Sequence, residues 1–285
     1  MQLGDFELIS VSGGTFRLDG GAMFGVVPKV LWQKKAPPDE RNRIPMATHC
    51  LVVRDGKQTV LIDTGYGSKA TAKERDLFDL QAGNPLVEGL SRHRIAPEEI
   101  ETVLLTHLHF DHVGGAIWRD PDGTLRPTFP NARYVAQRAE WETATSGAAE
   151  LEGSYPEENL LPLAEADQLE LVDGDVELRP GIRARVTGGH TRGHQAMVIE
   201  SGGQAAVYLG DVCPTTAHLR RMWCMGYDLF PLETRRVKPA LLGQAADEGW
   251  LVFWDHDPQV IAAYLGRDDS REFVLREPVY RTEDL

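Results

Sequence analysis

Four side chains of the types that bind metals stand within one short segment, His-Leu-His-Phe-Asp-His at residues 107–112. The segment follows the apolar run Val103–Leu105, which we expect to be a buried strand. Imidazole nitrogens and a carboxylate suit zinc and similar metals. Ligand sites of α/β proteins gather where strands end, so this spacing on a tight turn predicts a metal centre.

Three further strand ends present side chains of the same kinds. They are His190 after the strand predicted at residues 182–187, Asp211 after the strand at 204–209, and His256 after the strand at 250–254. Each of these residues, taken alone, is as easily a turn residue as a ligand. Four separate strand ends with ligand-type groups form a pattern that chance does not easily supply, so we expect them to meet at one centre.

The elements that position these residues are short strands with helices between them. We predict strands at residues 6–11, 50–53, 59–62, 102–106, 132–136, 168–172, 176–178, 182–187, 195–200, 204–209 and 250–254, and helices at 71–81, 85–92, 138–145 and 232–248. Long surface loops are expected at Pro37–Pro45 and Gly147–Pro162. The pattern predicts a single α/β domain over residues 1–285, with sheets inside and helices outside, in two pseudo-symmetric halves that meet near residue 165.

Composition and charge restrict the classes of partner. The 285 residues carry a net charge of −13, which repels polyanions and argues against nucleic acid as a partner. The apolar runs are far shorter than the roughly 20 residues that span a bilayer, and the N-terminus has no secretory pattern, so no membrane partner is expected. Cys50, Cys213 and Cys224 form no C-x-x-C pair and are interpreted as reduced thiols of a cytoplasmic protein.

Taken in order, these motifs resemble the metallo-β-lactamase fold hydrolases. The matching segments are His-x-His-x-Asp-His at 107–112, Gly-His-Thr-x-Gly-His at 189–194, Gly-Asp at 210–211, the late His256, and an early Asp-Thr-Gly at 63–65. The resemblance implies a four-layer αββα sandwich, two mixed sheets between outer helices. It also implies two divalent metal ions in a cleft at one edge of the sheets, zinc first, with iron, manganese and cobalt as alternatives.

The resemblance also assigns roles to individual residues. It implies that His107, His109 and His190 hold the first ion, that Asp111, His112 and His256 hold the second, and that Asp211 bridges both. Asp63 would support a ligand histidine from behind. His194 is interpreted as a residue behind the ligands or as a packing residue.

The chemistry expected of such a site is hydrolysis. Two ions roughly 3.5–4 Å apart share a water and lower its pKa toward about 7, which gives a metal-bound hydroxide at neutral pH. Asp111 or Asp211 would act as the catalytic carboxylate that takes the proton. The chain contains neither a Gly-x-Ser-x-Gly segment nor a His-Glu-x-x-His segment, so serine-nucleophile and zincin mechanisms have no support.

The layout is similar to the branch that opens N-acyl homoserine lactones, which also contains organophosphate hydrolases. A bridging Asp211 argues against the narrower zinc β-lactamases, and Cys213 is a poor substitute ligand because it lies on the other side of an extended chain. Hydrolysis of an organophosphate, aryl ester or thioester is one alternative. Others are a mono-iron glutathione persulfide dioxygenase and a metal-stabilised binding protein without turnover.

The substrate is expected to be a small molecule with an apolar portion. Several lactonases place a tyrosine three residues after the bridging aspartate, where this chain has Pro214. Thr215, His218 and Tyr227 are the candidates to replace it. Phe24 and Trp32 are expected in an apolar pocket, and core packing or a homodimer contact is the alternative interpretation of such residues.

Overall fold

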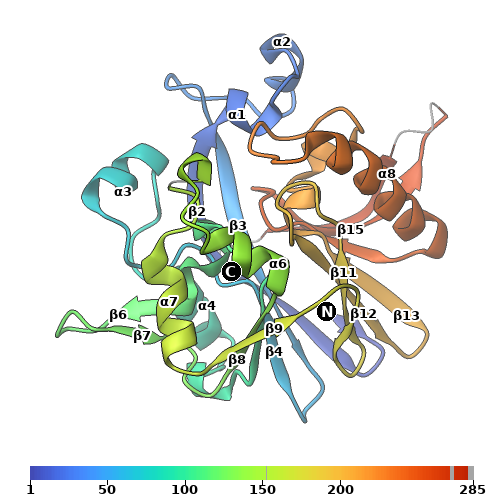
Figure 1. The fold of residues 1–285 in the computed structure, drawn as a ribbon. Helices are drawn as coiled ribbons and strands as arrows, with labels where there is room; N and C mark the ends of the chain where they lie inside the picture. The colour runs from blue at the N-terminus through green and yellow to red at the C-terminus, as the bar shows by residue number, and fades with distance from the viewer. Residues whose placement is uncertain (152, 270–272, 282–285) are drawn as a thin grey trace.

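The computed structural model describes residues 1–151, 153–269 and 273–281, and its core is two seven-stranded sheets (Figure 1). The first has the order β1 (Gln2–Leu3), β2 (Phe6–Asp19), β3 (Arg43–Arg54), β4 (Thr59–Ile62), β5 (Thr102–Leu104), β8 (Arg133–Gln137), β9 (Leu169–Val172). The second has the order β10 (Glu177–Arg179), β11 (Ile182–Val186), β12 (Gln195–Ser201), β13 (Gln204–Tyr208), β14 (Leu251–Phe253), β15 (Val260–Arg267), β16 (Phe273–Tyr280). The chain passes from one sheet to the other between Val172 and Glu177, a little beyond the predicted boundary near residue 165.

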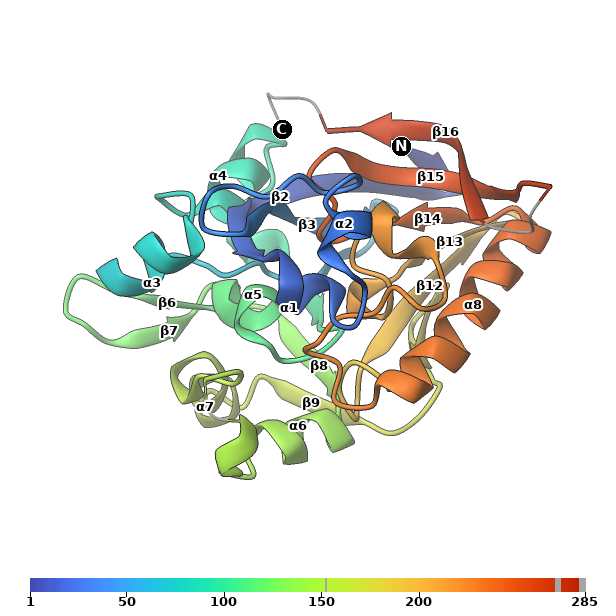
Figure 2. The same cartoon turned by 90° about the horizontal axis from the view of Figure 1, so that it is seen from above.

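Helices cover the outer faces of both sheets. The helices of the described residues are α1 (Gly20–Phe24), α2 (Lys29–Trp32), α3 (Ala72–Phe78), α4 (Pro85–Arg92), α5 (Phe110–Val113), α6 (Arg138–Ala144), α7 (Glu157–Glu165) and α8 (Pro231–Glu248), with 3-10 turns η1 (Pro97–Glu99), η2 (Gly114–Ala116), η3 (Ala149–Leu151), η4 (Gly210–Val212) and η5 (Thr216–Leu219). Of these, α4, α6 and α7 pack on the outer core of the first sheet and α8 on that of the second, whereas α1 and α2 belong to a separate apolar cluster. Figure 2 shows α8 beside the second sheet and α3, α4 and α7 on the opposite side of the molecule. This arrangement confirms the predicted αββα sandwich with two mixed sheets. No helix of the described residues is long and apolar enough to cross a membrane.

The alternation of side chains along the strands explains the layers. In β3, Leu51 and Val53 belong to the apolar cluster between the two sheets, whereas Cys50 and Val52 belong to the cluster under the helices of the first sheet. Strands that are apolar on both faces must be covered on both faces, because successive side chains point to opposite sides. Leu241 of α8 closes a third cluster on the outer face of the second sheet.

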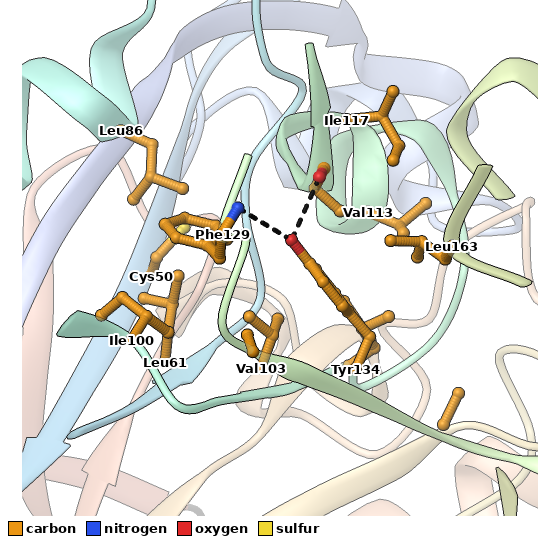
Figure 3. Packing of buried hydrophobic residues seen from close by; sticks show 14 of the residues in the cluster. Cys50, Leu61, Leu86, Ile100, Val103, Val113, Ile117, Phe129, Tyr134 and Leu163 are labelled. Carbon is orange, nitrogen blue, oxygen red and sulfur yellow. Dashed lines mark hydrogen bonds between the residues drawn. The ribbon is translucent and has the colours of Figure 1, made fainter. Parts of the chain in front are cut away.

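The outer core of the first sheet is organised around one tyrosine. Figure 3 shows the Tyr134 hydroxyl among apolar side chains, where it accepts a hydrogen bond from the Phe129 amide at 3.1 Å and donates to the Ala116 carbonyl at 3.2 Å. Both bonds involve backbone groups of the connection from α5 to β8. They compensate the burial of the hydroxyl and hold this connection, which follows the metal-type segment at 107–112, against the sheet.

Strand direction brings the predicted ligands together. In the first sheet β4, β5 and β8 run parallel to one another, and in the second β13 runs parallel to β14. Since β11 and β13 are both antiparallel to β12, they too run in the same direction. The loops that follow β4, β5, β11, β13 and β14 carry all the predicted ligands and their supports, and parallel strands end at one edge of a sheet.

Besides short elements that were not predicted, among them α1, α2 and α5, the fold departs from the sequence predictions in three longer segments. Helix α7 occupies the end of the loop predicted at Gly147–Pro162 and continues to Glu165, with Pro162 inside the helix. Strand β3 starts at Arg43, within the loop predicted at Pro37–Pro45. Two strands, β15 and β16, follow the last predicted strand. Proline 278 inside β16 is tolerated because this strand lies at the edge of its sheet.

Candidate metal centre

Two groups of metal-type side chains lie at this edge of the sheets. The first consists of His107, His109, His190 and Asp211, and the second of His112, Asp211, Asp255 and His256; within each group one donor atom per residue lies within 4.8 Å of all the others. We refer to them as the first and second donor groups. Six of the seven predicted ligands are therefore brought together here, and Asp255 joins them.

The carboxylate of Asp211 is shared by the two donor groups. Its Oδ2 lies 3.0 Å from His190 Nε2 and 3.8 Å from His107 Nε2. Its Oδ1 lies 3.2 Å from His256 Nε2 and 3.7 Å from His112 Nε2. Each oxygen thus faces one group, which is the geometry of a bridging carboxylate. Its place on η4, directly after β13, follows from the Gly-Asp turn at 210–211.

Asp111, the seventh predicted ligand, stands at the rim of the second donor group. Its Oδ2 is 3.5 Å from His256 Nε2, and its Oδ1 is 3.9 Å from His112 Nε2. The residue lies on α5 with its neighbour His112 and borders the cavity described below. Asp111 can therefore reach both an ion held by these histidines and a molecule in the cavity.

The outer nitrogens of three histidine rings are held by acceptor oxygens. His112 Nδ1 lies 2.9 Å from Asp63 Oδ2, and His256 Nδ1 lies 2.7 Å from the Ala47 carbonyl. His190 Nδ1 lies 3.0 Å from Asp228 Oδ1. Because the outer nitrogen of each ring donates its proton to an oxygen, the inner Nε2 of the neutral ring presents a lone pair.

These inner lone pairs face one another. His112 Nε2 and His256 Nε2 are 3.0 Å apart, and His190 Nε2 is 3.0 Å from His109 Nδ1. Two unprotonated nitrogens at such distances repel, so a proton or a metal ion must lie between them. Two ligands of a tetrahedral zinc ion stand about 3.3 Å apart, given a bond of about 2.0–2.1 Å to each. The donor set and its spacing therefore fit divalent metal ions.

The electrostatics of the cluster also fit divalent metal ions. Burial lowers the pKa of His107 and of His109, and the neighbouring histidines lower both further, so these rings are neutral ligands. Burial alone would lower the pKa of His112, but Asp63 and Asp111 outweigh it and raise the pKa to about 9.

The carboxylates of the cluster respond in opposite directions. Burial would raise the pKa of Asp211, but His190 and His256 hold it well below the usual range. Burial raises the pKa of Asp255 to about 7; His256 opposes this rise and the Asp211 carboxylate adds to it. The cluster therefore attracts positive charge, which a metal ion would supply.

Two predicted supporting residues occupy different places. Asp63 follows β4 and accepts hydrogen bonds from the Thr106 amide and hydroxyl, both at 2.8 Å, besides its contact with His112. His194 lies behind the first donor group, with ring centres 5.2 Å apart between it and His107, and its Nδ1 is 2.5 Å from the Thr187 hydroxyl. It belongs to neither donor group.

Glu140 was missed by the sequence reasoning and ties the two ligand loops together. It is fully buried, and it accepts hydrogen bonds from the Leu108 amide at 3.1 Å, the Thr191 hydroxyl at 2.6 Å and the Gly193 amide at 3.1 Å. A Cβ at Gly193 would lie 2.4 Å from the Glu140 amide nitrogen, so this close approach requires glycine. Gly193, the second glycine of the Gly-His-Thr-x-Gly-His segment, is the feature of the sequence that could have indicated a closely packed neighbour at this point.

A cavity of about 220 Å³ opens above the two donor groups. Its floor includes His109, Asp111, His190, Asp211 and His256. Its walls are mainly apolar: Leu18, Met23, Phe78, Phe110, Leu151, Met225, Tyr227 and Leu229. Met23 of α1 and Phe110 and Asp111 of α5 border the same cavity, so these two short helices both contribute to its lining. The cavity can hold a small molecule with one polar end on the floor and an apolar portion along the walls.

Of the five residues predicted for the substrate pocket, Tyr227 lines this cavity and the other four do not. Phe24 and Trp32 are buried and stacked at 5.3 Å between ring centres, inside the apolar cluster of the N-terminal segment. His218 stacks on Phe24 at 4.6 Å, and its Nδ1 is 2.7 Å from the Thr215 hydroxyl. Phe24, Trp32, Thr215 and His218 instead pack behind the wall that Met23 and Met225 form.

Comparison with known sequences connects this geometry with a family. A sequence model described as the metallo-beta-lactamase superfamily matches residues 43–256, most of the chain. An N-acyl homoserine lactonase of Bacillus cereus is 28% identical over 179 residues, which are 59% of this chain and 64% of that protein. The match thus spans less than two thirds of that relative's length.

Solved structures with the same fold cover nearly the whole chain. A probable metal-dependent hydrolase from Staphylococcus aureus superimposes with a TM-score of 0.88 and 32% identity, over 98% of this chain and 100% of that chain. AidC, a dizinc quorum-quenching lactonase in complex with its product, superimposes with a TM-score of 0.80 over 99% of this chain and 97% of that chain. At 20% identity, the second likeness is one of fold alone.

Proposed function

The chain belongs to the metallo-β-lactamase superfamily, and we propose that it is a metal-dependent hydrolase that opens lactone rings such as that of an N-acyl homoserine lactone. The observation that carries this proposal is the shared carboxylate of Asp211, which presents one oxygen to each donor group beneath the cavity. A two-centre site of this kind supports hydrolysis rather than a closed structural zinc site, which ends at four ligands. It also favours two ions over the single iron of a persulfide dioxygenase.

The proposed cofactors are two divalent ions, zinc first. His107, His109 and His190 would hold one ion, His112 and His256 with Asp111 the other, and Asp211 both. When bound, the ions supply an activated water and polarise the carbonyl of the substrate. The remaining steps depend on the protein's own side chains.

Ring opening requires a proton to move, and the proposal gives this transfer to the Asp111 carboxylate. Water oxygen bonds to the acyl carbon, the bond from that carbon to the ring oxygen breaks, and the ring oxygen leaves with a proton. Asp211 is held between histidine nitrogens at 3.0 and 3.2 Å, whereas Asp111 approaches them only to 3.5 Å and borders the cavity. We therefore assign the transfer to the Asp111 carboxylate.

The apolar walls provide a place for an acyl chain, and Tyr227 is the tyrosine that reaches the cavity. Pro214 stands at the position of the lactonase tyrosine, and Thr215 and His218 are bonded to each other behind the wall. We expect Tyr227→Phe to raise KM several-fold with little change in kcat, since it removes one hydrogen-bonding group from the substrate site. Tyr264→Phe, at an exposed position on β15, is the matched control; equal kinetics of both variants would remove Tyr227 from the site.

The test of the proposed function is the opening of a long-chain N-acyl homoserine lactone by the zinc-loaded chain. The protons that ring opening releases measure its rate. Opening that disappears on chelation and returns with zinc supports the proposal. A chain that carries two ions and leaves the lactone intact, but hydrolyses a phosphotriester, an aryl ester or a thioester, overturns the substrate class while the metal site stands. Oxygen consumption with glutathione persulfide would overturn the proposal that the protein is a hydrolase.

A further inference from the structure

We infer that Asp255 is an additional ligand of the ion in the second donor group, so that this ion meets three carboxylates where the first ion meets one. The inference deepens the proposed function and rests on its two-ion site. It concerns the residue directly before His256, to which the resemblance assigns no role.

The side chain of Asp255 is buried and has no hydrogen-bond partner. It is 1% exposed, and both carboxylate oxygens lack a partner among the described residues. A buried carboxylate without hydrogen bonds or a counter-charge is strongly unfavourable. Its Oδ2 lies 3.8 Å from His256 Nε2 and 4.0 Å from His112 Nε2, the two nitrogens whose lone pairs face each other. A cation between them would satisfy all three groups.

Other buried carboxylates near the site are engaged through hydrogen bonds. Asp63 accepts from Thr106 and contacts His112, and Glu140 accepts from both ligand loops. Asp257, two residues after Asp255, accepts from the Thr216 amide and hydroxyl and from the Gln259 and Val260 amides. Asp255 differs from these in having no such partner, so a role in holding a loop does not account for it.

The backbone fixes Asp255 at this position. The His49 amide donates to the Asp255 carbonyl at 2.7 Å, and the Ala47 amide donates to the His256 carbonyl at 3.3 Å. Both bonds come from β3, so the segment after β14 is anchored to the first sheet as well as the second. The carboxylate is therefore held next to the donor nitrogens rather than free to turn toward solvent.

An extra carboxylate changes which metals the second donor group prefers. His112 and His256 supply nitrogen, and Asp111, Asp211 and Asp255 supply oxygen. Carboxylate-rich sites with more than four ligands favour manganese and iron(II) relative to nitrogen-rich four-ligand sites, which suit zinc. The two ions therefore differ in kind: the first position selects zinc, and the second accepts manganese more readily than the first.

The test is Asp255→Asn in the full chain, with Asp122→Asn at an exposed surface position as the matched control. Metal-free protein is loaded with zinc or manganese, ions per chain are counted by mass spectrometry, and each dissociation constant is obtained by competition with a chelator. We expect the second ion to bind at least about tenfold more weakly in the variant, with the first unchanged and the largest loss for manganese.

A second readout separates a ligand from a structural residue. In the metal-free protein Asp255→Asn removes a buried carboxylate whose burial His112 and His256 offset only in part, so its melting temperature should rise above that of the unmodified chain, while its gain in stability on metal loading should shrink. An unchanged affinity for the second ion overturns the inference, whatever the melting temperature of the metal-free variant. Uptake of only one ion by the unmodified chain overturns both the inference and the two-ion site. Two ions without lactone opening overturn the substrate alone.

Discussion

The two donor groups share Asp211 but differ in the atoms that they offer and in what holds them. The first has three imidazoles, from the loops after β5 and β11, and His190 is supported by Asp228. The second has two imidazoles and several carboxylates, supported by Asp63 and by the Ala47 carbonyl. Similar strand ends thus produce a nitrogen-rich and an oxygen-rich position, and the difference should appear as a difference in metal affinity and selectivity.

The largest expected effect comes from the residue common to both groups. Asp211→Asn removes the shared negative charge, and we expect kcat/KM for lactone opening to fall by more than about 100-fold, because loss of a supporting residue alone costs 10–100-fold. The metal content should fall below two ions per chain. Kinetics and mass spectrometry of the same preparation measure both, with Asp122→Asn as control; a fully active variant with two ions would contradict the assignment of Asp211.

A pair of variants separates the two groups. Asp228→Asn removes the support of His190, and Asp63→Asn removes that of His112. We expect each variant to bind one of the two ions about 10–100-fold more weakly and to bind the other with nearly unchanged affinity.

Chelator competition with zinc, read separately for the two ions, measures this selectivity. If both variants weaken the same ion, or both ions equally, the division into two donor groups is wrong.

The candidate ligands could be named from the sequence because their spacing is local. Residues 107–112 lie in one turn after an apolar strand, and each remaining candidate follows a strand end, so periodicity and turn residues pointed to them and the resemblance supplied their roles. Asp228 and Glu140 could not be found in this way. They meet His190 and Leu108 only through the tertiary fold, across 38 and 32 residues. The sequence could not place Phe24 and His218 behind the cavity wall, because an aromatic side chain near a site gives the same sequence pattern whether it lines the cavity or packs behind it.

Metal binding should release protons, because metals need unprotonated ligands. Asp63 and Asp111 raise the pKa of His112 to about 9 against the effect of burial, and Asp211 and Asp228 raise that of His190 to about 10. Both rings are therefore protonated at pH 7.5 in the metal-free chain, and metal affinity should increase as the pH rises toward 9. We expect about two protons released per chain. Calorimetric titration in two buffers of different ionisation enthalpy counts them; no release would contradict these assignments.

The smallest effect is expected at Cys213. Its thiol is fully buried in the cluster under α8, and its Sγ lies 3.8 Å from the Thr215 carbonyl, outside both donor groups. Cys213→Ser should leave two ions per chain and reduce the free energy of unfolding by about 1 kcal/mol, since a hydroxyl is buried less favourably than a thiol. Denaturant unfolding and metal analysis measure both, and loss of one ion would show that the thiol is a ligand.

The most direct test of the two-centre site is anomalous scattering at the zinc edge from a crystal of the zinc-loaded chain. We expect two peaks, one among His107, His109 and His190 and one between His112 and His256, with the Asp211 carboxylate between them. A single peak, or a second peak away from His112 and His256, would contradict the two-centre site.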